Sequence, residues 1–128
     1  MEEMSEYQIH CGIVSQLKKK NNPFKDIIKR MNHPASGEKR NEKTAAKLKK
    51  MGVIEGVPDL HLPFPKKPYH GFYMEIKKPK GKLSKKQKDY IQYLISVGYA
   101  VKIARSIGEG KDAVMKYLLG EHNNDSII

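Results

Sequence analysis

A chain of 128 residues is long enough to bury one hydrophobic core and too short for two, so we expect a single domain over residues 1–128. Lysine and arginine total 25 against 14 acidic residues, a net charge of +11 that favours a polyanionic partner, with nucleic acid as the first candidate. Cys11 is the only cysteine, which excludes an internal disulfide and a cysteine-based zinc site, and no stretch approaches the about 18 apolar residues of a membrane span.

The first half of the chain predicts two helices separated by a strand. The first helix begins at about Ser5, a good N-cap, continues through apolar residues at helical spacing and stops at the Asn-Asn-Pro sequence of residues 21–23. Residues 24–31 carry two isoleucines among charged residues, and we interpret them as a short strand. Asn41 is the predicted N-cap of a second helix with a basic face, and Gly52 follows its end as a left-handed stop.

The second half begins with a predicted hairpin. Residues 56–62 and 72–77 alternate apolar and polar side chains, which is typical of strands, and the segment between them is rich in turn residues. A capping-box sequence, Ser84-Lys-Lys-Gln87, opens the next helix, which Gly98 closes.

The last predicted elements are a strand at residues 99–104 and a helix at about 110–119, and we expect residues 120–128 to form a loose tail. The predicted order is α-β-α-β-β-α-β-α. This order places the chain in the α/β class, with a central mixed β-sheet flanked by helices.

Three charged residues on the hairpin strands point to one site. Glu75 and Lys77 are two apart in a strand, so both side chains leave the same face, with Cα atoms about 6.5 to 7 Å apart. Asp59 on the partner strand can reach the same volume, and two carboxylates beside an ammonium are the groups that metal-dependent phosphodiester hydrolysis needs. The five histidines lack the HExxH spacing, so a metal would rely mainly on carboxylates, which suit Mg²⁺ or Mn²⁺. The alternative is a Glu–Lys ion pair on a solvated strand, with Asp59 as an ordinary turn residue.

The sequence around these residues resembles a known family. Residues 49–59, 73–77 and 81–87 closely resemble the VRR-Nuc branch of the PD-(D/E)xK nuclease superfamily, and the resemblance extends from about Glu6 to Arg105. It implies a restriction-endonuclease-like core. It also implies a set of catalytic residues, which are Asp59, Glu75, Lys77 and Gln87, and a metal site formed by Asp59, Glu75 and the backbone carbonyl of Ile76.

Two further residues have two interpretations each. Gln87 matches the glutamine of the family's active site, but a glutamine three residues after Ser84 also completes a capping box. Glu6 matches an acid on the family's first helix and is a candidate metal ligand, but an acid there also complements the helix dipole.

Basic residues supply the expected DNA contacts. Residues 33–40 resemble the family's basic, glycine-rich loop, with Lys39 and Arg40 as phosphate contacts, although a solvated loop would have the same composition. Residues 101–105 resemble the family's Val-Arg-Arg pattern only loosely, which weakens the case for Arg105 as a DNA contact. The remaining candidates for DNA binding are Lys43, Lys47, Lys80, Lys82, Lys85 and Lys86.

The resemblance implies a Mg²⁺- or Mn²⁺-dependent, structure-specific DNA endonuclease of the stand-alone, phage or bacterial type. Such relatives resemble homodimeric Holliday junction resolvases, so we expect branched DNA as the substrate and a homodimer as the active form. We expect no membrane partner and no nucleotide cofactor. The acidic start of the chain is unlike a signal peptide, so we expect a cytoplasmic protein of a bacterium, or of the host cytoplasm if phage-encoded. The alternatives are a nuclease acting on flaps or simple duplex ends, and a non-catalytic basic module that binds DNA.

Overall fold

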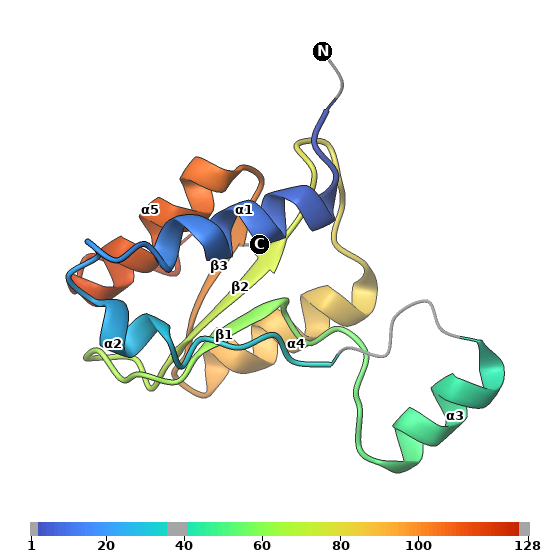
Figure 1. Ribbon diagram of the computed structural model, residues 1–128. Helices are drawn as coiled ribbons and strands as arrows, with labels where there is room; N and C mark the ends of the chain where they lie inside the picture. Colours follow the sequence, from blue (N-terminus) through green and yellow to red (C-terminus); the bar gives the residue numbers. More distant parts are fainter. Residues whose placement is uncertain (1–2, 36–40, 126–128) are drawn as a thin grey trace.

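The computed structural model describes residues 3–35 and 41–125 (Figure 1). Its helices are α1 (Glu6–Leu17), α2 (Lys25–Ile28), α3 (Glu42–Lys50), α4 (Lys85–Ser96) and α5 (Ile107–Leu118). Its strands are β1 (Leu60–Leu62), β2 (Phe72–Ile76) and β3 (Ala100–Ala104). The α/β class and the predicted order of elements are confirmed except at the second element, where a helix replaces the predicted strand.

The prediction of a strand at residues 24–31 is wrong because local hydrogen bonds turn the chain there. Asn22 Oδ1 accepts the N–H of Phe24 at 2.8 Å, and the Phe24 carbonyl accepts the N–H groups of Ile27 and Ile28, each at 3.0 Å. The apolar residues of this segment are also spaced as on a helix, at positions 24, 27, 28 and 31. The helical spacing, rather than the presence of two isoleucines, was the informative pattern.

The three strands form one mixed sheet in the order β1-β2-β3. β1 is antiparallel to β2, with Leu60 opposite Met74, and β3 is parallel to β2, with Ala104 opposite Ile76. The predicted hairpin is therefore present. Helices α1 and α5 lie side by side on one face of the sheet, and α4 lies on the other face (Figure 1).

Two apolar clusters match the two faces of the sheet. The alternation predicted for β2 holds, because Phe72, Met74 and Ile76 join the larger cluster under α1 and α5, whereas Tyr73 packs on the smaller cluster under α4. The smaller cluster consists of Ile91, Leu94 and Val101. Glu75 follows Tyr73 by two residues and so belongs to the α4 face.

Glycine allows α1 and α5 to approach closely. A Cβ at Gly12 would lie 2.2 Å from Ile107 Cδ1, and a Cβ at Gly110 would lie 2.3 Å from Ile13 Cδ1. Such contacts are too short for real side chains, so the two glycines let the helices pack at this distance. This packing fixes α1 against the sheet and so positions the residues in the first turns of α1.

The predicted N-caps are confirmed. Ser5, Asn41 and Ser84 each accept a hydrogen bond from the backbone N–H three residues later, and the predicted helix ends at Gly52 and Gly98 have φ of 94° and 96°. Helix α3 has no buried residue and lies to one side of the sheet (Figure 1).

Part of the segment expected to be a loose tail is packed against the fold. Asn124 Oδ1 accepts the N–H of Val101 at 2.9 Å, and its Nδ2 donates to the carbonyl of Tyr99 at 2.9 Å. The ring of His122 lies against those of Phe72 and Tyr117. Within residues 3–35 and 41–125, none of the helices has the length and apolar character required to cross a bilayer.

Candidate active site

The hairpin brings the two predicted acids together. Leu60 pairs with Met74, Asp59 directly precedes Leu60, and Glu75 directly follows Met74, so the two acids belong to the same end of the hairpin. Asp59 Oδ2 also accepts the backbone N–H of Ile76 at 2.7 Å. The carboxylate of Asp59 is therefore held at the end of β2, beside the residue that follows Glu75.

Glu75 is buried, with only 3% of its surface exposed. This burial argues against the interpretation of a solvated ion pair on an exposed strand. A buried carboxylate requires hydrogen bonds, a counter-charge or a metal ion. One of its contacts is with α4, where Gln87 Nε2 donates to Glu75 Oε2 at 3.4 Å.

Gln87 completes the predicted capping box and also contacts Glu75, and its catalytic role stays a prediction. Its Oε1 accepts the backbone N–H of Ser84 at 2.8 Å and so completes the capping box of α4. Its Nε2 is the donor to Glu75. The same side chain begins a helix and orients an acid of the candidate site.

Lys77 lies just beyond β2 and is partly buried. Its N–H donates to the carbonyl of Ala104 at 3.0 Å, which extends the pairing of β2 with β3 by one residue. By strand alternation its side chain leaves on the same side as that of Glu75. Lys77 and Glu75 thus lie at the end of β2 that also holds the Asp59 carboxylate, and their joint catalytic role stays a prediction.

Arg105 holds the loop that follows Lys77. Its Nη1 donates to the carbonyls of Lys78, Pro79 and Gly81 at 2.8, 3.2 and 2.7 Å. A Cβ at Gly81 would lie 3.6 Å from Lys77 Cδ, so the clamped loop runs beside the lysine stem. The structure therefore assigns Arg105 a loop-holding contact, and its expected DNA contact stays a prediction.

The turn before Asp59 requires a glycine at position 56. Its φ is 91°, and a Cβ there would lie 2.5 Å from the backbone oxygen of Lys86 at the start of α4. A residue with a side chain would meet both a left-handed backbone and a backbone clash. The turn is thus packed directly against the part of α4 that carries Gln87.

Glu6 is the first residue of α1 and is exposed. Among the described residues, three side chains lie close enough together to hold a metal, namely His10, His33 and Asp59. Glu6 does not belong to this set. A metal-ligand role for Glu6 stays a prediction.

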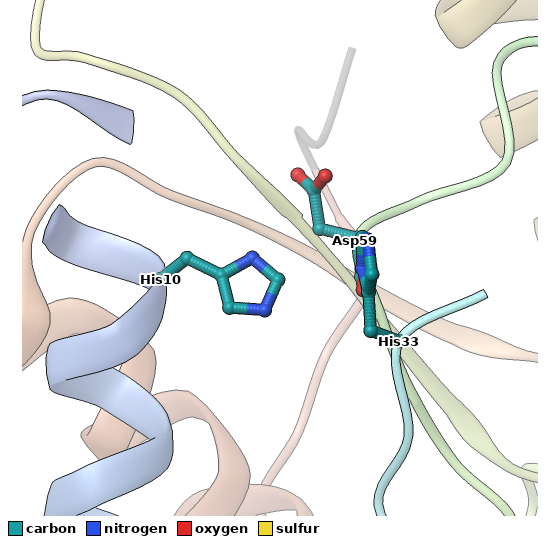
Figure 2. Close-up of side chains that lie close together, drawn as sticks. All are labelled: His10, His33 and Asp59. Atoms are coloured by element: carbon teal, nitrogen blue, oxygen red, sulfur yellow. The ribbon is translucent and has the colours of Figure 1, made fainter. Parts of the chain in front are cut away.

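The two histidines come from separate segments, His10 from α1 and His33 from the chain after α2 (Figure 2). One ligand atom from each of His10, His33 and Asp59 lies within 4.8 Å of the others, and the two imidazole rings are 5.0 Å apart in an edge-to-face arrangement. Burial lowers the pKa of His10, the neighbouring His33 lowers it further, and the Asp59 carboxylate opposes the shift. A neutral imidazole is the form that can bind a cation.

Sequence reasoning missed these histidines. His10 lies one helical turn after Glu6, which places both on one side of α1 and was the only local signal. His33 follows His10 by 23 positions in a different segment, and no spacing rule joins them. The reasoning that a metal would depend mainly on carboxylates did not consider these two imidazoles beside Asp59, and that prediction stays untested.

The other predicted DNA contacts have different surroundings. Lys39 and Arg40 lie outside the described residues. Lys86 Nζ pairs with Glu55 Oε2 at 3.0 Å. The remaining predicted contacts are exposed lysines on α3, in the loop after β2 and at the start of α4, namely Lys43, Lys47, Lys80, Lys82 and Lys85.

A mixed sheet flanked by helices, with two acids and a lysine at the end of its central strand, is an arrangement that agrees with nuclease domains of the PD-(D/E)xK kind. The chain matches the VRR-NUC domain over residues 4–107 and belongs to the VRR-NUC family, a nuclease-type family. A solved structure described as a VRR_NUC domain protein has the same fold, with a TM-score of 0.77 and 23% sequence identity over 95% of this chain and 98% of that chain. No curated protein matches the sequence.

Proposed function

We propose that this protein is a metal-dependent endonuclease that hydrolyses phosphodiester bonds in DNA. The observation that carries the proposal is the hydrogen bond from Ile76 N–H to Asp59 Oδ2, which holds one acid beside the strand that bears Glu75 and Lys77. Membership of a nuclease-type family supports the same activity.

The residues present fit a hard divalent cation. Asp59, Glu75 and the carbonyl of Ile76 offer oxygen donors, and Mg²⁺ and Mn²⁺ favour oxygen. The burial of Glu75 also favours a cation, because a carboxylate in that position gains from a positive neighbour. When bound, the ion would supply Lewis-acid activation of the phosphate and of a water molecule.

Side chains of the protein would supply the remaining functions, which are charge stabilisation and positioning. Lys77 would offset the negative charge that grows on the phosphate and would orient the attacking water. Gln87 holds the Glu75 carboxylate through its Nε2. Arg105 fixes the loop beside Lys77 and so limits the movement of the lysine.

The preferred substrate is branched DNA, such as a Holliday junction, cut by a homodimer. The net charge of +11 favours a polyanion, and exposed lysines on α3 and at the start of α4 are available to contact phosphates. Symmetric cleavage of a junction requires two active sites, and one chain supplies one. Two-fold pairing of the chain would supply the second.

The test compares labelled four-way junction, splayed, flap and linear duplex DNA in Mg²⁺ or Mn²⁺. Lys77→Ala and Glu75→Gln should each lower the cleavage rate by at least about 10²- to 10³-fold, the typical cost of one group that stabilises transition-state charge. Binding of uncleaved DNA should persist in both variants. Lys116→Ala, which removes an exposed charge on α5 outside the predicted contacts, is the matched control and should cut like the wild type.

Cleavage by Lys77→Ala at the wild-type rate would remove Lys77 from the mechanism. Binding without cleavage by the wild type would identify a non-catalytic DNA-binding module. Equal rates on junction and linear duplex would overturn the branched substrate, and a monomer in sedimentation experiments with bound junction would overturn the dimer.

A further inference from the structure

Two histidines lie beside Asp59, one of the proposed catalytic acids, although only oxygen donors were expected there. His10, His33 and Asp59 offer ligand atoms within 4.8 Å of one another (Figure 2). Zinc–nitrogen bonds are about 2.1 Å long, so two ligand atoms at the tetrahedral angle on one ion are about 3.4 Å apart. A small side-chain movement would therefore bring all three atoms to one ion.

The hydrogen bond of His33 occupies one ring nitrogen and leaves the other available to a metal. Nδ1 of His33 lies 2.6 Å from the backbone oxygen of Asp59. Because a carbonyl oxygen only accepts, Nδ1 carries the proton, and the neutral ring keeps its lone pair on Nε2. Metal-binding histidines are commonly oriented in this way, by an N–H bond to a backbone carbonyl or a carboxylate.

The carboxylate of Asp59 is oriented as well. Its Oδ2 is held by the N–H of Ile76, and a carboxylate has further lone pairs to offer a cation. Both the carbonyl and the carboxylate of Asp59 thus take part, one by holding His33 and the other as a ligand.

A pocket opens beside the two rings. Its volume is about 430 Å³, and its walls include His10, His33, Lys18 and Asn32. This volume accommodates the water molecules that would complete the coordination of an ion with three protein ligands. Ligand exchange with solvent is therefore possible on that side.

We propose that His10, His33 and Asp59 form a binding site for a first-row transition ion, with a preference for Mn²⁺, Co²⁺ or Zn²⁺ over Mg²⁺. Imidazole nitrogen suits the transition ions, whereas Mg²⁺ favours oxygen and retains its water. Asp59 belongs to both this site and the oxygen-rich centre, so the two lie side by side. Any contribution of the second ion to DNA cleavage rests on the proposed function, but its binding does not.

The experiment titrates the full-length protein with Co²⁺ alone, without DNA, by calorimetry and by NMR of the histidine rings. Co²⁺ is paramagnetic, so sub-stoichiometric ion should broaden the signals of His10 and His33 before those of His70, an exposed histidine outside the set. His10→Gln and His33→Gln should each weaken Co²⁺ binding by at least about 10- to 100-fold, the cost of losing even an outer-shell partner of a metal. His70→Gln is the matched control and should bind like the wild type.

The outcomes separate this inference from the proposed function. Unchanged Co²⁺ affinity in folded His10→Gln and His33→Gln, with Mg²⁺-dependent cleavage intact, would overturn the histidine site and leave the nuclease proposal standing. Loss of Co²⁺ affinity in both variants, together with a wild type that cuts no DNA, would support the histidine site and overturn the nuclease proposal. Circular dichroism of each variant checks the fold, and broadening confined to His70 would also overturn the site.

Discussion

Gly56→Ala tests whether the turn before Asp59 depends on close packing against α4. The substitution places a Cβ 2.5 Å from the Lys86 carbonyl at a φ of 91°. A left-handed backbone costs an L residue about 1–2 kcal/mol, and overpacking adds about 1–3 kcal/mol. The expected loss in the free energy of unfolding is about 2–5 kcal/mol, a large share of the total for a domain of this size.

The same substitution should also lower DNA cleavage. Relief of the clash moves the turn that carries Asp59 away from the start of α4, and a misplacement of about 1 Å can cost about 10²-fold in rate. Urea denaturation measures the stability, and single-turnover cleavage at a temperature where the variant is folded measures the rate. The folded variant should therefore be slow as well as unstable.

Gly120→Ala provides the control for backbone strain alone. Gly120 has a φ of 78°, but its Cβ would meet only the flexible end of Lys66, at 3.4 Å. Its loss in the free energy of unfolding should stay at about 1–2 kcal/mol, with cleavage unchanged. Equal losses in Gly56→Ala and Gly120→Ala, with wild-type cleavage in both, would refute the close-packing argument.

Two further predictions concern the capping box and the pH dependence. Ser84→Ala should lower the free energy of unfolding by about 1 kcal/mol, the cost of an N-cap, and retain cleavage. Gln87→Leu should lower both the free energy of unfolding and the cleavage rate, because it also removes the donor to Glu75. Similar cleavage rates for the two variants would contradict this prediction. Burial lowers the pKa of His61 below its usual 6.5, so the unfolded chain binds more protons, and the free energy of unfolding should fall as the pH drops below 6.5. His61→Phe keeps a ring on Tyr73 and should make this decrease in urea denaturation smaller, and a decrease of the same size would count against the argument.

Local chemistry was readable from the sequence because it acts within three or four residues. Ser5, Asn41 and Ser84 bond to backbone N–H groups three positions later, so their sequence patterns predict helix starts directly. The alternation in β2 likewise follows from a period of two. In residues 24–31 two signals compete, because the adjacent isoleucines favour a strand whereas the spacing of positions 24, 27, 28 and 31 fits a helix.

Contacts between distant segments were not readable in the same way. Asn124 is bonded to Val101 and Tyr99, more than twenty positions away, so a polar composition predicted a loose tail where part of the chain is held. His10 and His33 meet only because α1 packs on α5 and the chain after α2 returns to β1, where Asn32 bridges to His61. Nothing in either local sequence encodes that meeting.

The positions of Asp59, Glu75 and Lys77 depend partly on local patterns and partly on contacts between distant segments. Alternation and a hairpin are enough to predict that the three share one region, since each acts over a short range. The burial of Glu75 depends instead on α4, whose position follows from packing of Ile91 and Leu94 on Val101. Sequence alone therefore left a solvated ion pair open, and the structure argues against it.

Gln87 shows why its two interpretations were compatible. An amide side chain has an acceptor oxygen and a separate donor nitrogen, so Oε1 can cap α4 while Nε2 contacts Glu75. The start of the helix and the orientation of the acid are consequently coupled through one side chain. Because the turn at Gly56 rests on the same end of α4, the segment that leads to Asp59 packs beside the residue that contacts Glu75, and a Cβ at Gly56 would disturb both acids at once.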